Sequence, residues 1–375
     1  MRIALVITEL DPGGAEKCLT QLACFLADRG HHVKVFAIGP PPTAGQDHFL
    51  QELKAHNVSV AFGIGPGRVR SMRSFPKVVV WLRSELRQFL PEVVQSMLFH
   101  GNLLAALAAD NKRVRVFGGV RVRQPERWRW LLERWSSHRM LKLVCVSEDV
   151  ARHCERIERI RPEKLVTIPN GIDLEAVDQI VHATPVLKWT QFGLPDDARV
   201  LLFVGRLHPQ KGIEELVVRS NDLLSALPQH HLVVIGNGPL ERRLQELATA
   251  RVHILGWKSN VLAWMHRAEV LVLPASYEGM PNVLLEAMAV RLPFIAFDVE
   301  GVRQLLGDSA FAPNQIAAPG DFEQFISLTG QMALDPVLRT NCASSNYAQV
   351  ERYFQLQNQL ATYLEMYRAS GPSNL

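Results

Sequence analysis

Two loops in the second half of the chain carry side chains whose types and spacing could bind an anionic ligand. Arg206 and Lys211 follow the apolar run 200–204, and Glu278 follows the apolar run 270–274. A guanidinium offers a planar fork to phosphate oxygens, and a lysine adds a mobile point charge. The two cations therefore suit a diphosphate. A basic loop that is simply solvated and binds no ligand is an equally weighted alternative interpretation.

The residues after Glu278 combine a glycine, a proline and a second carboxylate. Gly279 lets backbone approach a ligand closely, and Pro281 suits a first helical turn, where free N–H groups favour a phosphate or a sugar oxygen. Glu278 and Glu286 could suggest glycoside hydrolysis, but eight helical residues would separate them by about 12 Å. Paired glycosidase carboxylates lie roughly 5 to 9.5 Å apart. Contacts with two parts of one long ligand therefore fit this spacing better.

Glycines also follow three other strand-like runs of the second half. Gly205, Gly236 and Gly256 each stand where a sheet would end, and Trp257 follows the last of them. Their small size would let backbone lie against a flat base, although each could equally be a turn residue. Trp257 fits a packing role at a domain edge better than a stacking platform.

The first half holds a weaker phosphate-loop signal. Gly13 and Gly14 follow the first apolar run, but their spacing is not G-x-G-x-x-G, and no acidic residue follows the second run to hold a ribose of NAD. A dehydrogenase is therefore disfavoured, and the absence of a Walker-type motif disfavours the common ATPases. His100 stands just beyond another strand-like run, where it could face a cleft or simply pack.

Composition and length bound the remaining possibilities. At 375 residues the chain is long for one core, so two domains are expected. No apolar run approaches the roughly 20 residues that span a bilayer. The five cysteines are scattered without a C-x-x-C pair, which fits a reduced cytoplasmic setting. The loops hold no Asp-x-Asp pair and no His/Cys cluster, so neither a metal nor a cofactor is expected.

Charge is divided unevenly along the chain. Residues 1–170 hold 26 Lys and Arg against 16 Asp and Glu, and the remainder holds 15 against 21. Within the basic half, the segment 113–139 interleaves arginines with Trp128, Trp130 and Trp135. A helix from Glu126 would gather these side chains on one face, as interfacial membrane helices do. RNA binding, or a surface helix with its tryptophans inward, are the alternatives.

Apolar runs alternate with helical patterns through most of the chain, which predicts α/β folding around parallel sheets. The segment 174–197 lacks sustained periodicity and suggests a linker. We therefore expect two doubly wound, Rossmann-like domains facing a central cleft, at 1–180 and 181–350, with a last helix in 351–375 returning towards the first domain. The expected strands are 2–8, 33–38, 58–62, 93–95, 114–118, 143–146, 165–168, 200–204, 232–235, 252–255, 270–274 and 294–297.

Five motifs, in order along the chain, resemble those of the retaining glycosyltransferases of family 4, which have the GT-B fold and an E-x7-E signature. The motifs are P-G-G-A-E at 12–16, V-T-I-P-N-G-I-D at 166–173, V-G-R-L-H-P-Q-K-G at 204–212, I-G-N-G-P at 235–239 and E-G-M-P-N-V-L-L-E-A-M-A at 278–289. As a set they are specific for the family and say little about the sugar.

The resemblance implies roles for individual residues. Arg206 and Lys211 would hold the donor diphosphate, Glu286 the donor ribose, and Glu278 with the backbone that follows it the transferred sugar. The implied catalytic residues are Arg206, Lys211 and Glu278. The implied donor-binding residues are Gly13, Gly14, Gly205, Gly236, Gly256, Trp257, Gly279, Met280, Pro281, Asn282, Val283 and Glu286.

One position departs from the family pattern. Many members carry a histidine in a stretch resembling G-[IV]-R-H, and Val122 stands at that place here. Arg121 or His100 is therefore expected to serve on the acceptor side.

The family resemblance implies a metal-independent hexosyltransferase that uses a UDP- or GDP-sugar and a glycan or lipid-linked acceptor, in cell-envelope synthesis. The basic first domain suggests peripheral contact with the inner face of an anionic membrane, and no nucleic-acid partner is expected. The alternatives are a weakly active sugar-nucleotide-binding protein and a sugar-nucleotide epimerase of the same fold.

Overall fold

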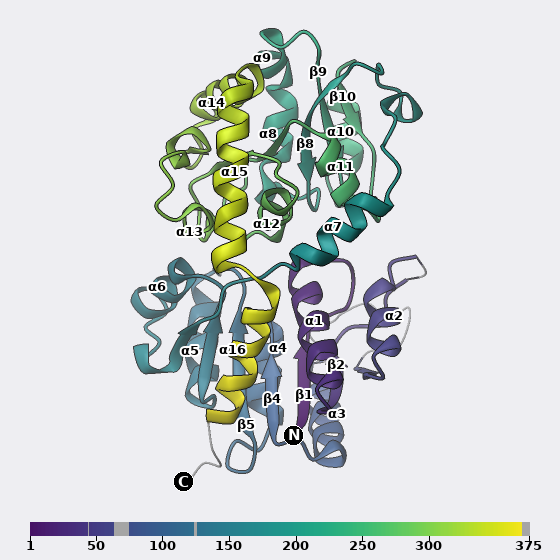
Figure 1. Cartoon of the computed structure of the whole chain (residues 1–375). Coiled ribbons are helices and arrows are strands. Elements are labelled where there is room, and N and C mark those ends of the chain that lie inside the picture. The colour runs from purple at the N-terminus through teal and green to yellow at the C-terminus, as the bar shows by residue number, and fades with distance from the viewer. Residues whose placement is uncertain (44, 64–74, 124–125, 370–375) are drawn as a thin grey trace. The chain divides into compact units, whose positions relative to one another are not determined.

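The computed structural model describes residues 1–43, 45–63, 75–123 and 126–369, which form two compact units. The first unit is Met1–Asn170 with Asn358–Leu375, and the second is Gly171–Gln357. The segment expected to be a linker holds the helix α7 (Leu174–Ala183), which belongs to the second unit. Both units consist of helices and strands (Figure 1).

The first unit is built on a seven-stranded sheet in the order β3-β2-β1-β4-β5-β6-β7, with every neighbouring pair parallel. The order reverses between β1 and β4, which makes their carboxyl ends the switch point of a doubly wound sheet. The strands are β1 (Arg2–Ile7), β2 (His32–Ala37), β3 (Ser59–Phe62), β4 (Val93–Ser96), β5 (Arg115–Val120), β6 (Lys142–Cys145) and β7 (Leu165–Thr167).

Helices connect these strands, and sequence signals fix several of their ends. Gly30, at φ 76°, follows α1, and Ser147 caps α6 by accepting the Val150 N–H at 3.3 Å. The helices are α1 (Gly14–Asp28), α2 (His48–Ala55), α3 (Phe75–Phe89), α4 (Phe99–Ala108), α5 (Arg127–His138), α6 (Glu148–Arg156) and α16 (Leu356–Ala369).

The second unit repeats the design with a six-stranded sheet in the order β10-β9-β8-β11-β12-β13, again parallel throughout. Its order reverses between β8 and β11. The strands are β8 (Arg199–Val204), β9 (His230–Ile235), β10 (Val252–Ile254), β11 (Val270–Leu273), β12 (Phe294–Phe297) and β13 (Ile316–Ala317). The helices besides α7 are α8 (Ile213–Val218), α9 (Ser220–Ser225), α10 (Glu241–Leu247), α11 (Val261–Arg267), α12 (Asn282–Ala289), α13 (Val302–Leu306), α14 (Phe322–Leu334) and α15 (Pro336–Tyr353).

The last helix, α16, packs within the first unit after α15 has ended in the second (Figure 1). The Tyr367 hydroxyl donates to Gln95 Oε1 at 3.1 Å, and its ring centroid lies 5.2 Å from that of Phe117. Arg115 Nη1 donates to the Tyr367 carbonyl at 2.6 Å. These contacts hold α16 against β4 and β5. The predicted class of two doubly wound, Rossmann-like domains is confirmed.

Candidate functional site

The two loops singled out from the sequence follow β8 and β11, the neighbouring strands of the second switch point. The Ser276 N–H donates to the Gln210 carbonyl at 2.8 Å, and Gln210 Nε2 donates to the Tyr277 carbonyl at 2.9 Å. Ligands of doubly wound sheets bind at the carboxyl ends of the strands at such a point. The loops are therefore held together at the place where the topology favours a ligand.

Lys211 and Glu278, one from each loop, form a direct ion pair. Their side chains are only 17% and 10% exposed. A charge that has lost most of its water depends on its partner, and removing one member of a buried pair typically costs about 3–5 kcal/mol. The two groups that the family resemblance assigned to phosphate and sugar thus stabilise each other in this structure.

Arg206 extends from the same loop as Lys211 but is exposed, with no ion-pair partner among the described residues. His208 lies between them and accepts the Gln210 N–H through Nδ1 at 3.2 Å, as a cap of the turn Pro209–Lys211. Burial lowers the pKa of His208, and the charges of Arg206 and Lys211 lower it further. His208 is therefore a neutral capping residue, and Arg206 is the cation that solvent reaches.

Two glycines allow the loops to meet backbone to backbone. Gly212 has φ 65°, and a Cβ there would lie 1.9 Å from the Pro274 carbonyl oxygen. Gly236 has φ 144°, and a Cβ would lie 1.9 Å from the Gly205 carbonyl oxygen. Only glycine fits such positions. The packing of the loops accounts for both residues, and contact of Gly236 with a donor stays a prediction.

The loops after β8, β9 and β10 form one continuous edge. The Gly205 N–H donates to the Ile235 carbonyl and the Gly236 N–H to the Gly256 carbonyl, both at 3.0 Å. Trp257 follows, with part of its side chain exposed. The glycines proposed to approach a base are thus brought together along the carboxyl edge of the sheet.

The segment after β11 carries the remaining predicted donor contacts. Glu278, Gly279, Met280 and Pro281 are buried, whereas Asn282, Val283 and Glu286 are half-buried. Pro281 is the N-cap of α12, with φ −73° and ψ 115°, so the helix begins one residue later than expected. Asn282 therefore occupies the first helical position, where backbone N–H groups lack partners within the helix.

In the first unit, Gly13 and Gly14 mark the start of α1 after β1. A Cβ on Gly13 would lie 2.2 Å from Glu16 Oε2, because the buried Glu16 carboxylate folds back over the helix start. Glu16, the last residue of the motif P-G-G-A-E, stands three residues after the N-cap Gly13, where a glutamate is a capping signal. His100 is exposed in the first turn of α4, after β4, on the other side of this switch point.

Arg121 lies just after β5 and is enclosed by protein. Its Nη2 donates to Asn170 Oδ1 and, at 2.9 Å, to Cys18 Sγ, while Nη1 has no hydrogen-bond partner among the described residues. Burial acts to lower the pKa of Arg121, but Cys18 and Tyr363 hold it above its ordinary value. Arg121 thus ties α1 to the turn at Asn170, and its acceptor role stays a prediction. Val122 is half-buried beside it.

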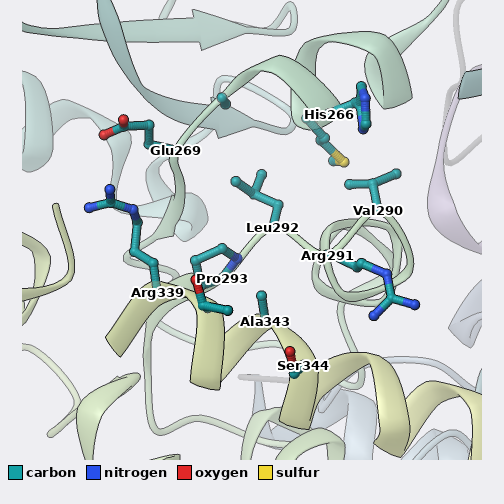
Figure 2. Close-up of a pocket in the computed structure, with 12 residues that line it drawn as sticks. His266, Glu269, Val290, Arg291, Leu292, Pro293, Arg339, Ala343 and Ser344 are labelled. Carbon is teal, nitrogen blue, oxygen red and sulfur yellow. The ribbon is translucent and has the colours of Figure 1, made fainter. Parts of the chain in front are cut away.

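A cavity of about 350 Å³ lies away from these loops, at the amino ends of the strands (Figure 2). Glu269 and Pro293, which line it, directly precede β11 and β12. Glu269 pairs with Arg199 at 2.7 Å, and Arg339 donates to two backbone carbonyls. Its charged groups are therefore already engaged in holding the unit together, and it is separate from the switch-point loops.

Within the described ranges, no helix is both long and apolar enough to cross a membrane. The same residues include no group of three or more His, Cys, Asp or Glu side chains that could hold a metal ion.

Two family models match the chain, one in each unit. "Glycosyltransferase Family 4" matches residues 12–176, and "Glycosyl transferases group 1" matches residues 198–335. The two matched ranges contain the motifs noted in the sequence.

Curated relatives include a UDP-Gal:alpha-D-GlcNAc-diphosphoundecaprenol alpha-1,3-galactosyltransferase of Escherichia coli, 27% identical over 58% of this chain. That match spans 57% of the relative, which is less than two thirds of its length. A phosphatidyl-myo-inositol mannosyltransferase of Mycobacterium tuberculosis is 26% identical over 91% of this chain and 89% of its own.

Among solved structures, Anabaena HepE in complex with UDP-glucose superposes with a TM-score of 0.80. The superposition covers 98% of this chain and all of the other at 17% identity, which shows a shared fold.

Proposed function

The chain belongs to the family 4 glycosyltransferases of the GT-B fold, and on that premise we propose that it moves a sugar from a nucleoside diphosphate donor to an acceptor hydroxyl with retention of anomeric configuration. The observation that carries the proposal is the joining of a cationic loop and an acidic loop at the second switch point. One loop suits the diphosphate of such a donor, and the other suits its sugar.

The proposed mechanism is mainly electrostatic. The bond between the anomeric carbon and the diphosphate oxygen breaks as the acceptor oxygen attacks the same face of the sugar, and the acceptor proton passes to the leaving phosphate. Arg206 and Lys211 would offset the charge that develops on that phosphate, because fixed cations need no reorganisation during the reaction. Glu278, already paired with Lys211, would orient both the ammonium and the sugar hydroxyls.

The donor and acceptor classes follow from the relatives. The E. coli relative is named for UDP-Gal and a diphosphoundecaprenol acceptor, and the M. tuberculosis relative for phosphatidyl-myo-inositol. We therefore propose a UDP- or GDP-hexose donor and a lipid-linked acceptor for this chain, with the protein at the cytoplasmic face of an anionic membrane. We also propose that transfer proceeds without a divalent metal.

An assay of the purified chain with UDP-glucose, UDP-galactose and GDP-mannose tests the proposal. We expect one donor to raise the thermal midpoint, since a ligand that binds only the folded state stabilises it. The same donor should release its nucleotide when a lipid-linked acceptor is added. Binding without turnover across an acceptor panel would instead indicate a sugar-nucleotide-binding protein, and conversion of donor without acceptor would indicate an epimerase.

Arg206→Gln tests the diphosphate contact, because Arg206 is exposed and its loss should not disturb the fold. Turnover should fall by roughly tenfold or more, in line with the loss of one charged contact to a developing anion. Arg352→Gln, which changes an exposed arginine of α15, is the matched control. Equal turnover of the two variants would remove Arg206 from the mechanism.

A further inference from the structure

The helix α5 turns three large apolar side chains outward and buries a carboxylate and two serines. Trp128, Leu131 and Trp135 are 54%, 69% and 41% exposed, whereas Glu133 and Ser136 are 2% and 1% exposed. A surface helix normally buries its apolar stripe against the core. Trp128, Leu131 and Trp135, here called the α5 stripe, therefore lie on a face that the first unit covers only in part, with the Trp128 ring 5.7 Å from that of Phe99 in α4.

Polar contacts fix this orientation of α5. Asn102 Nδ2 of α4 donates to Glu133 Oε1 at 2.6 Å, a bond that joins the buried face of α5 to a neighbouring helix. The ring of Trp130, on the flank of the helix, lies 5.9 Å from that of His153 in α6. Because rotating α5 would expose these groups and break their contacts, the outward position of the stripe follows from how the helix is seated.

Basic residues accompany the stripe. Trp128, Leu131 and Trp135 follow the spacing i, i+3, i+7 on one side of the helix, and Arg127 and Arg134 are exposed on the same side. Neither arginine has an ion-pair partner within the described part of the chain. Exposed apolar residues gathered on one face mark interaction sites more often than chance placement does. Figure 1 shows α5 beside α6 at one side of the first unit.

We propose that the α5 stripe inserts into the interface of an anionic lipid bilayer, with Arg127 and Arg134 at the level of the phosphates. Leu131 is the most exposed member, and an aliphatic side chain offers no stacking surface to a nucleic-acid base, which favours lipid over RNA. Tryptophans on either side of it suit the boundary between head groups and acyl chains. The inference rests on the proposed function in one respect: the lipid-linked acceptor of the proposed reaction lies in such a membrane.

Flotation with vesicles tests the surface directly. The full chain should float with vesicles of phosphatidylglycerol and phosphatidylcholine at low salt and much less with pure phosphatidylcholine. The triple variant W128S/L131S/W135S should partition roughly a hundredfold less, since each side chain would no longer be buried in the interface. Arg127→Gln with Arg134→Gln should lower partition by roughly fivefold for each charge and weaken its salt dependence.

Leu334→Ser is the matched control, because Leu334 is 58% exposed at the end of α14 in the second unit. It should float like the unaltered chain, and circular dichroism should show all variants folded. The proposal would be overturned if the unaltered chain did not float, or if the triple variant floated equally well. It would also be overturned if the triple variant kept its flotation but lost self-association or RNA binding that the unaltered chain shows.

Transfer to a short-chain, detergent-soluble acceptor separates this surface from the proposed activity. Transfer that persists while flotation fails would remove the membrane surface alone. Flotation that persists without transfer to any acceptor would remove the activity and leave the surface in place.

Discussion

Replacing Glu133 by glutamine should stabilise the first unit increasingly as pH rises. Glu133 lies on the inward face of α5 with its carboxyl group buried. Burial raises its pKa to about 8, the bond from Asn102 opposes this rise, and the nearby charge of Glu158 adds to it. Burial also raises the pKa of Glu158 to about 7. His153 Nε2 lies 3.5 Å from Glu158 Oε1, and the neighbouring Cys154 thiol acts against the rise in the pKa of Glu158.

The magnitude follows from proton linkage. The pKa of Glu133 moves from 4.5 in the unfolded chain to about 8 in the folded protein. Between these values the folded protein holds a proton that the unfolded chain has lost, so the free energy of unfolding falls by about 1.4 kcal/mol per pH unit. Glutamine does not titrate and can still accept the Asn102 N–H. The variant should therefore gain about 1 kcal/mol over the parent at pH 5.5 and about 4 kcal/mol at pH 7.5.

Urea unfolding followed by tryptophan fluorescence at pH 5.5, 6.5 and 7.5 measures this gap. Glu163→Gln makes the same chemical change at an exposed residue of the first unit and should show no pH-dependent gain. A gap of equal size at all three pH values, or a Glu133 variant less stable than the parent at pH 7.5, would refute the reasoning.

Three other predictions concern the second unit. Lys211→Ala should lower the thermal midpoint far more than Arg206→Ala, because it leaves the buried Glu278 carboxylate without its ion-pair partner. Adding Glu278→Gln to the Lys211 variant should recover most of the loss. No recovery would show that the pairing is unimportant. Gly212→Ala should lower the free energy of unfolding in urea by several kcal/mol, because its Cβ would overlap a backbone carbonyl. Gly193 has a similar φ of 78° but open space around it, so Gly193→Ala should cost about 1–2 kcal/mol. Equal costs would contradict the steric argument. Transfer should continue in excess EDTA, and activity restored only by added magnesium or manganese would contradict metal independence.

Strands were predictable because each is a short apolar run bounded by turn residues. All twelve expected runs coincide with strands within a few residues, as β8 (Arg199–Val204) does with the run 200–204. The helix α7 was missed because only Leu174 and Val177 of its ten residues are buried, which leaves a weak period. The strand β13 has only two residues and gives no period at all.

The sequence was enough to locate the loops of the candidate site, but it did not show which side chains contact each other there. Glycines and charged residues after apolar runs located the loops, because polar groups at strand ends stand out in the sequence. The pairing of Lys211 with Glu278 joins residues 67 positions apart, and it depends on β8 lying beside β11. Strand order is a property of the whole sheet and leaves no local signal.

The orientation of α5 could not be predicted from its amino-acid sequence. The sequence allowed a helix with its tryptophans inward, and the structure buries Glu133 and exposes Trp128 and Trp135 instead. The partners that decide the matter, such as Asn102, come from other helices. A composition rich in arginine and tryptophan therefore indicated an unusual helix without showing which side faces solvent.

The central claim is retaining transfer from a nucleoside diphosphate sugar, and proton NMR of the product tests it most directly. The purified chain is incubated with each α-linked UDP- or GDP-hexose and a lipid-linked acceptor, and the anomeric signal of the new glycoside is recorded with the released nucleotide. We expect an α-glycoside formed together with an equal amount of nucleoside diphosphate. A β-glycoside, or nucleotide release with no glycoside formed from any donor, would contradict it.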